Sequence, residues 1–272
     1  MFITSSVIFA IIALYLPGRL NQSNPVDSGR STAALSTLSP RNPFIAGERL
    51  SYDVSWADFI VAAEFTIETD QRRSFDGIDG YHVTAQARTV GLVNGLFKVN
   101  DIYESFIDSA TLKPFRAEKR SRHGKNQTQS SVTIDQGKRS AQLGEGRTLE
   151  INEDTYDLAS LIFAIRGMDL TIGKTRTLTV FEDGKLYTIN LQPEAREKVT
   201  TRAGSYDAVK IATSRSKGRE NDKLYNLRIY ITADAARLPV MITAEPSWGS
   251  VRVELTSATG IKRDERPERG KP

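Results

Sequence analysis

The chain has few residues of the kinds that carry catalytic chemistry, with two histidines and no cysteine in 272 residues. The absence of cysteine excludes disulfides, thiolate metal sites and a cysteine nucleophile. His82, between Tyr81 and Val83, lies on the polar face of a predicted strand and could act as a base or a metal ligand. A hydrogen-bonded or solvated strand histidine is the more common case. His123 lies in a stretch that we predict to be an exposed basic turn, residues 121–125.

The usual signatures of an active site are missing. Neither histidine completes H-E-x-x-H, and the sequence has no G-x-S-x-G or G-x-G-x-x-G motif. Glu64 and Glu68 share one face of a predicted strand, where solvated acids are the default. We therefore predict a protein that is not an enzyme and has no metal or cofactor. A hydrolase that uses His82 is the minor alternative.

The densest charge feature is a basic cluster in residues 113–125. Alternation along a strand divides its charges between the two sides of a sheet. The simplest interpretation is a charged edge that resists aggregation. The alternative is contact with anionic lipid headgroups or with a polyanionic envelope polymer. The candidate anion contacts are Arg116, Lys119, Arg120 and Arg122.

Nucleic acid is not an expected partner. The 37 basic and 33 acidic residues give a net charge of only +4, and phosphate binding needs a contiguous positive face.

Alternation of apolar and polar residues dominates the body of the chain and predicts about a dozen strands. Leu50, Tyr52, Val54 and Trp56 share one face, opposite Arg49, Ser51, Asp53 and Ser55. These apolar faces would either pack together or line a groove. The candidate groove or packing residues are Tyr52, Trp56, Phe65, Tyr81 and Ile165.

One segment, Thr155–Met168, has apolar residues at helical spacing instead. Asp154 or Thr155 can cap its N-terminus, and Asp157 would add negative charge in the first turn. The predicted fold is mainly β, a large curved antiparallel sheet or open half barrel, with one α-helix covering or plugging it. We place it in a single domain, residues 43–260.

The two ends of the chain differ in composition from the body. Val7–Leu16 is an uninterrupted apolar run, so residues 1–20 are predicted to be a signal peptide or, alternatively, an uncleaved N-terminal anchor in the inner membrane. Residues 21–42 are predicted to be a disordered tether and residues 261–272 a disordered charged tail. The predicted location is the periplasm.

Six short stretches together resemble a known family. They are Phe44–Tyr52, Leu96–Asp101, Asp157–Leu161 with its continuation to Arg166, Ala203–Ala208, Arg237–Val240 and Gly249–Leu255. In this order they are similar to a bacterial exported family known only as domain of unknown function 3108. The resemblance implies an envelope protein with a large curved antiparallel sheet, and it carries over no catalytic residue. The chain has Ala62 and Ala63 where the family usually has glycine, so we expect an ordinary strand in place of a bend.

These observations predict a non-enzymatic periplasmic or envelope protein with a surplus of apolar strand faces. Such a curved sheet could bind a lipid-like or envelope-polymer ligand in a groove. The alternative is a structural or protein-interaction module of the envelope that binds no small ligand.

Overall fold

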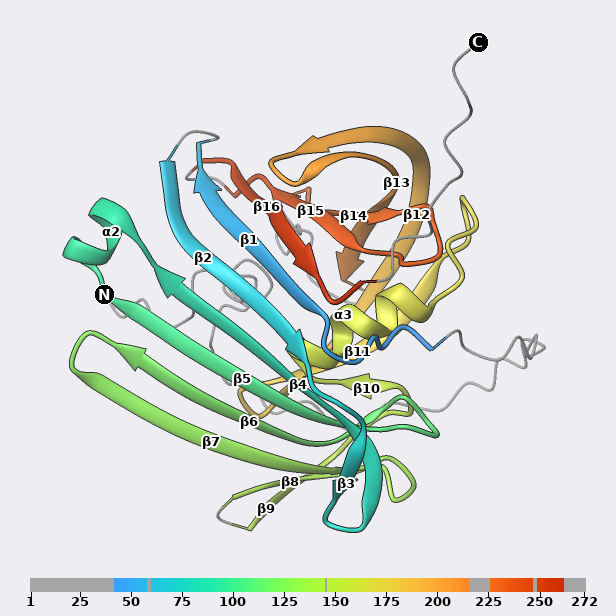
Figure 1. Cartoon of the computed structure of the whole chain (residues 1–272). Helices are drawn as coiled ribbons and strands as arrows, with labels where there is room; N and C mark the ends of the chain where they lie inside the picture. The colour runs from blue at the N-terminus through green and yellow to red at the C-terminus, as the bar shows by residue number, and fades with distance from the viewer. Residues whose placement is uncertain (1–41, 58–59, 145, 216–225, 247–248, 262–272) are drawn as a thin grey trace.

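Sixteen strands and two helices make up the part of the chain that the computed structural model describes, residues 42–57, 60–144, 146–215, 226–246 and 249–261 (Figure 1). The elements of the first half are β1 (Arg49–Trp56), β2 (Ile60–Thr69), β3 (Arg73–Phe75), β4 (Ile78–Thr89), α2 (Gly91–Leu96), β5 (Val99–Asp108), β6 (Pro114–His123), β7 (Asn126–Asp135), β8 (Ser140–Leu143) and β9 (Arg147–Glu150). Those of the second half are β10 (Thr155–Tyr156), α3 (Leu158–Gly167), β11 (Arg176–Glu182), β12 (Lys185–Thr201), β13 (Gly204–Arg215), β14 (Arg228–Thr232), β15 (Pro239–Ala244) and β16 (Val251–Thr259).

All sixteen strands belong to one sheet that does not close. Its order is β10-β11-β12-β13-β14-β15-β16-β1-β2-β4-β5-β6-β7-β8-β9, with β3 paired only to β4. Every neighbouring pair is antiparallel except the short β10–β11 pair. The predicted fold, a large antiparallel sheet in the form of an open half barrel, is confirmed.

The first and last strands of the body meet at the centre of this sheet. β1 pairs with β16 from Arg49↔Thr259 to Trp56↔Val251. Beyond β16, Gly260 has a φ of +76°, and a Cβ there would overlap the carbonyl oxygen of Gly47. Glycine is therefore required at the point where the two ends of the body cross.

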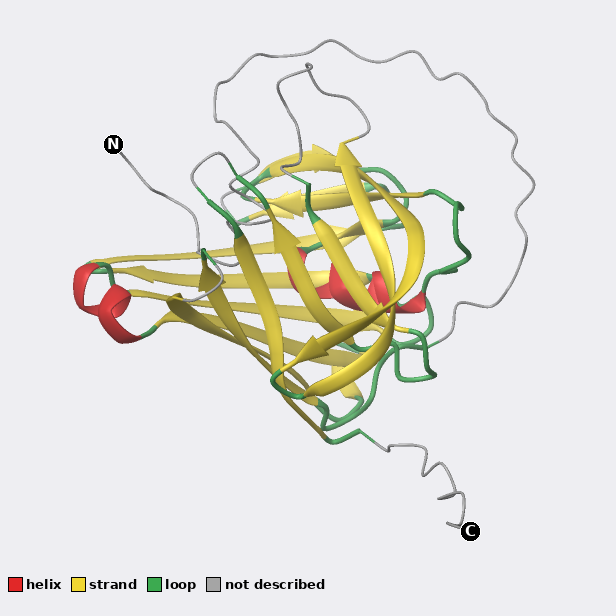
Figure 2. Ribbon diagram, turned by 90° about the horizontal axis from the view of Figure 1, so that it is seen from above, coloured by secondary structure: helices red, strands yellow, loops and turns green. Residues whose placement is uncertain are grey.

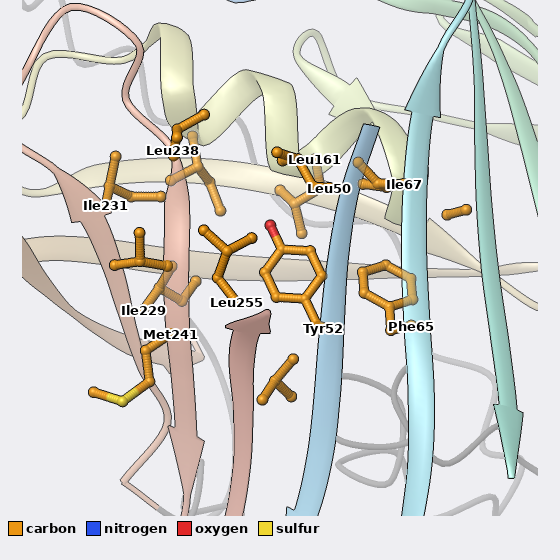
Figure 3. Close-up of a cluster of buried hydrophobic side chains, with 14 of the residues drawn as sticks. Leu50, Tyr52, Phe65, Ile67, Leu161, Ile229, Ile231, Leu238, Met241 and Leu255 are labelled. Carbon is orange, nitrogen blue, oxygen red and sulfur yellow. The ribbon is translucent and has the colours of Figure 1, made fainter. Parts of the chain in front are cut away.

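The helix α3 lies inside the curve of the sheet (Figures 1 and 2). Its buried side chains, among them Leu161 and Phe163, belong to one core with residues of β1, β2, β4, β5 and β11–β16. Figure 3 shows part of this core, where Leu161 of α3 lies beside Leu50 of β1 and Ile67 of β2. The predicted role of the helix, covering the inner face of the sheet, is confirmed.

The start of α3 differs from the prediction. Thr155 and Tyr156 form β10, which pairs with Thr179 and Val180, so the helix cannot begin before this pairing ends. The N-cap is Asp157, whose side chain accepts from the backbone N–H groups of Ala159 and Ser160. The predicted caps, Asp154 and Thr155, were wrong because a two-residue strand has too little pattern to be recognised.

The expectation of an ordinary strand at Ala62 and Ala63 was also wrong. In the β1–β2 register Val54 pairs with Ala63 but Ser55 pairs with Val61, so Ala62 is an extra residue. Such a bulge increases the local bend and twist of the strand. Both alanines are buried, and this irregularity is formed without glycine.

Several elements were not predicted. They are α2, β3, β8, β9 and β10, and β12 is one long strand in place of two, with a register shift between Pro193 and Ala195. Most of the predicted terminal segments, residues 1–20, 21–42 and 261–272, lie outside the described residues. In the described part of the chain, no helix has both the length and the apolar character to cross a bilayer.

Candidate functional site

The apolar residues that could have lined a groove are mostly packing residues. Tyr52 and Phe65 are buried, and their ring centroids are 5.6 Å apart (Figure 3). The Tyr52 hydroxyl donates to the carbonyl oxygen of Pro239 at 2.9 Å, and burial raises the pKa of Tyr52 above its ordinary value. Ile165 is buried in α3, whereas Trp56 is 44% exposed at the end of β1.

The remaining member of that set, Tyr81, belongs to an aromatic stack. The ring of Phe44 lies between the rings of Tyr81 and Phe163, with centroid distances of 4.6 and 4.4 Å. Asn42 donates to the Tyr81 hydroxyl at 2.9 Å. This stack attaches the segment before β1 to both β4 and α3, so its role is structural.

A buried ion pair joins the same segment to the end of α3. The side chains of Glu48 and Arg166 are both fully buried, with Nη1–Oε2 and Nη2–Oε1 distances of 2.5 and 2.9 Å. Arg166 also donates to the carbonyl oxygen of Ala236 at 3.1 Å. This bidentate geometry pairs the two charges inside the core and leaves only Nε of the guanidinium without a hydrogen-bond partner.

The outer face of the sheet carries a polar trough across β1, β2 and β4. Ser51 pairs with Thr66, and Thr66 pairs with Gln86, so short hydroxyl side chains lie next to each other on neighbouring strands. Longer charged side chains flank them, and the result is a cavity of about 500 Å³. The residues that line the trough are Arg49, Ser51, Tyr52, Asp53, Glu64, Phe65, Thr66, Gln86, Arg88 and Thr256.

Both signs of charge lie along the walls of the trough. Arg88 donates to Glu64 at 2.5 Å, and Arg49 pairs with Glu68. At the other wall, Asp53 pairs with Arg202. The lining contains two arginines, Arg49 and Arg88, and two acids, Asp53 and Glu64, so its charges balance. It is also rich in hydrogen-bond donors and acceptors.

His82 lies on the outer face of β4, outside the trough. Its ring stacks on Phe106 with centroids 4.7 Å apart, and its Nδ1 lies 2.8 Å from Oδ2 of Asp70. Its Nε2 is 3.2 Å from Oε1 of Glu104 without the alignment of a hydrogen bond. The side chain is only 12% exposed, so little of the ring is left to contact a substrate.

His123 does not lie in an exposed turn, and that prediction was wrong. It ends β6 opposite Val99, on the inner face, and its Nε2 is 3.1 Å from Oδ1 of the fully buried Asp101. Ser121, on the same face, has a buried hydroxyl without a hydrogen-bond partner. Serine, histidine and aspartate are thus close together, but no hydrogen bond links the hydroxyl to the imidazole as a nucleophile and its base would require.

The four candidate anion contacts do not form one site. Arg116 pairs with Asp76 and lies over the Phe106 ring, and Arg120 donates to Glu104 at 2.5 Å on the same outer face. Lys119 points to the inner face, as alternation predicted, and donates to Glu182 at 2.7 Å. Arg122 is exposed near the end of β6, opposite Gln127.

The Lys119–Glu182 pair connects β6 to the β11–β12 hairpin. Burial raises the pKa of Glu182 to about 7, although the charge of Lys119 opposes this shift. Burial also opposes the charge of Lys119, but Glu182, Tyr103 and Asp183 outweigh it and raise the pKa of Lys119. Glu182 is therefore the group in this pair whose charge changes near neutral pH.

This shift predicts a pH dependence of stability. Because the folded pKa of Glu182 lies above its ordinary 4.5, the folded state binds the proton more tightly than the unfolded state. The free energy of unfolding should then fall by roughly 1–3 kcal/mol between pH 4.5 and pH 7. Urea unfolding of the wild type and of Glu182→Gln across this range measures it. If the free energy of unfolding changed with pH equally in the wild type and in Glu182→Gln, the pH dependence would not come from Glu182.

The trough was not predicted from the sequence. Ser51, Thr66, Gln86 and Arg88 are ordinary polar residues on the outer side of strands. The only signal was a pair of short hydroxyl residues on neighbouring predicted strands. The cross-strand register that brings them together cannot be read from one sequence.

Comparison with solved structures supports the barrel-like fold. The chain is similar to a beta-barrel-like protein of domain of unknown function DUF1849 from Brucella abortus, with 16% identity, a TM-score of 0.54, and coverage of 79% of this chain and 97% of that one. Weaker matches are a DUF1089 family protein from Pseudomonas aeruginosa (12% identity, TM-score 0.39, 66% and 89% covered) and a Bacteroides fragilis protein described as exported with a YmcC-like fold (12% identity, TM-score 0.33, 78% and 95% covered).

Among curated proteins, none matches the chain. The family described as "Protein of unknown function (DUF3108)" matches residues 51–256, most of the chain, and so confirms the resemblance found in the six short stretches. The chain therefore belongs to the DUF3108 family.

Proposed function

We propose that this protein is a non-enzymatic protein of the cell envelope that binds a segment of a polar envelope polymer in the outer trough. The observation that supports the proposal is the trough itself, about 500 Å³ in volume and lined mainly by charged, hydroxyl and amide side chains. That volume lies in the range of ligand sites, roughly 300–1,000 Å³.

The chemistry of the lining favours a polar ligand over an acyl chain. Arg49 and Arg88 can donate to acidic or hydroxyl groups, and Asp53 and Glu64 can accept from hydroxyl or amino groups. Ser51 and Thr66 at the floor can do both. A polymer that carries hydroxyl, amide and charged groups matches this set, whereas a lipid tail would leave these groups without partners.

Two further observations are consistent with this function. The lining contains no histidine, and its two carboxylates, Asp53 and Glu64, are each paired with an arginine. The apolar run Val7–Leu16 supports export to the envelope.

The proposal predicts that blocking the trough removes the ligand. Thr66→Trp places a bulky ring on the floor, and tryptophan is well tolerated on strands. Thr84→Trp is the matched control, because Thr84 is equally half-buried on the outer face of β4 but does not line the trough. Native mass spectrometry of protein purified from envelopes should show a co-purifying polymer on the wild type and on Thr84→Trp, and at least about ten-fold less on Thr66→Trp.

The outcomes separate the candidate functions. Equal loading of the two tryptophan variants would place the ligand elsewhere, and a bare mass for the wild type in repeated preparations would remove the binding function. A co-purifying lipid would replace the polymer as the ligand. If crosslinking in cells instead traps one defined protein at Arg49 or Arg88, the interaction-module alternative is correct.

A further inference from the structure

Exposed apolar side chains gather at one end of the sheet, on and around α2. Leu92 and Leu96 are 89% and 90% exposed, and Phe97 is 40% exposed. Trp56 and Ile60, at the β1–β2 end, are exposed at 44% and 38%. Of the large exposed apolar side chains in the described residues, only Ile172 is not part of this group. We define the end patch as Leu92, Leu96, Phe97, Lys98 and Lys125.

The end patch is continuous across the strand ends. The backbone N–H of Val90, before α2, donates to Ala62 of β2 at 3.0 Å. On the other side of α2, the N–H of Gly124 in the β6–β7 turn donates to the carbonyl oxygen of Lys98 at 2.8 Å. Figure 1 shows α2 and the β6–β7 turn projecting together from this end of the long strands.

The helix α2 makes few contacts with the body, among them the hydrogen bond from the Thr89 hydroxyl to the side chain of Asn94 at 3.3 Å. It has six residues, none of them buried, and its N-cap residue makes no side-chain hydrogen bond. Leu92 and Leu96 are one turn apart, so both lie on the same face. A single uncapped turn with two exposed leucines is not stable by itself in water, which indicates that another surface covers it.

The charge around the end patch indicates what that surface is. Residues 90–100 and 121–134 contain Lys98, Arg122 and Lys125 but no aspartate or glutamate. Lys98, Arg122 and Lys125 are exposed. Exposed leucine and phenylalanine bordered by lysine and arginine, without acids, is the composition of surfaces that lie in the headgroup region of anionic membranes.

We propose that the end patch docks on the surface of a membrane that contains anionic phospholipids. Leu92, Leu96 and Phe97 insert among the headgroups, and Lys98 and Lys125 face the lipid phosphates. This attachment is made by the folded body and does not depend on residues 1–20 or on a ligand in the trough. The trough is a separate surface on the outer face of β1, β2 and β4, and its lining residue Arg88 lies near the end of β4 that leads into α2.

Vesicle sedimentation with the full chain tests the proposal. The vesicles contain either phosphatidylcholine alone or equal parts of phosphatidylcholine and phosphatidylglycerol. The wild type should bind the anionic vesicles more tightly, and added salt should weaken this binding. The double variant Lys98→Glu with Lys125→Glu should weaken binding to the anionic vesicles by at least roughly five-fold for each substituted lysine. Leu92→Ser with Leu96→Ser should weaken it about ten-fold.

Two controls match these changes. Ile172→Ser removes an apolar side chain outside the patch that is 46% exposed. Lys138→Glu reverses a lysine just beyond the far end of β7, the strand that begins next to Lys125. Neither control should alter binding to anionic vesicles. All the substituted side chains are exposed, so unchanged thermal unfolding shows that each variant is folded.

Three outcomes would overturn the proposal. The first is no preference of the wild type for anionic vesicles. The second is equal binding by the wild type and the patch variants, which would assign vesicle binding to the N-terminal apolar run. The third is a dimer in light scattering that Leu92→Ser with Leu96→Ser converts to a monomer while vesicle binding is unchanged. In that case the end patch is a surface for a second copy of the chain.

Discussion

Replacing Glu48 by leucine is expected to lower the free energy of unfolding by about 3–5 kcal/mol. Glu48 and Arg166 are both fully buried and paired at two positions. The substitution leaves the guanidinium of Arg166 inside the core with only the carbonyl oxygen of Ala236 as a partner. Equilibrium unfolding in urea, monitored by circular dichroism, measures the loss.

The adjacent residue provides the matched control. Arg49 pairs with Glu68 on the surface, where both side chains are about half exposed. Arg49→Leu should cost no more than about 1 kcal/mol. The double variant Glu48→Leu with Arg166→Met should recover most of the lost stability, because it removes both buried charges together. Equal losses for Glu48→Leu and Arg49→Leu would contradict this account.

Phe163→Ala is expected to destabilise the protein by about 3–5 kcal/mol. The ring is buried in α3 and stacks on Phe44, which in turn stacks on Tyr81. Its removal leaves a cavity and releases the segment before β1 from the helix. The same urea experiment measures the change, and Phe163→Leu, which keeps most of the volume, should cost less.

Phe97→Ala is the control for this second prediction. Phe97 is 40% exposed in the end patch, so its removal should change the free energy of unfolding by no more than about 0.5 kcal/mol. A loss as large as that of Phe163→Ala would show that α2 is packed against the body more firmly than the burial of its residues indicates.

The strands could be predicted where apolar and polar residues alternate over many positions. β1 and β4 have buried residues at every second position, and their predicted apolar faces were correct except for Trp56, which is exposed. β8, β9 and β10 have only two to four residues each. Strands of that length give no measurable period, so they become visible only through their pairing with neighbours.

The helix α3 shows a second limit of sequence patterns. Its spacing predicted one apolar face, with Leu158, Leu161, Ile162, Ile165 and Met168, of which Ile162 and Met168 are only partly buried. The structure buries Phe163 and Arg166 as well, because the curved sheet surrounds the helix on more than one side. A pattern rule for an amphipathic helix cannot anticipate a charged residue whose partner, Glu48, is 118 residues away in the sequence.

The candidate sites depend on information that a single sequence lacks. The trough requires the register between Ser51 and Thr66, and the Asp101–His123 pair requires the register of β5 with β6. The division of the basic cluster between two faces could be predicted, since it follows from alternation alone. Its neutralisation could not, because the acids that pair with Arg116 and Lys119 come from the distant residues Asp76 and Glu182.

The strand order ties the assembly of the sheet to the synthesis of its last strand, β16. From edge to edge it follows the sequence from β10 to β16 and then from β1 to β9, with β3 set beside β4. A circular permutant opened between β9 and β10 would therefore pair strands that are consecutive in the sequence, apart from β2 with β4. In the natural connectivity a single seam, β1 with β16, joins positions 210 apart (259 − 49). Translation must therefore reach the last strand before the middle of the sheet can close, which makes that seam the main source of high contact order and slow folding.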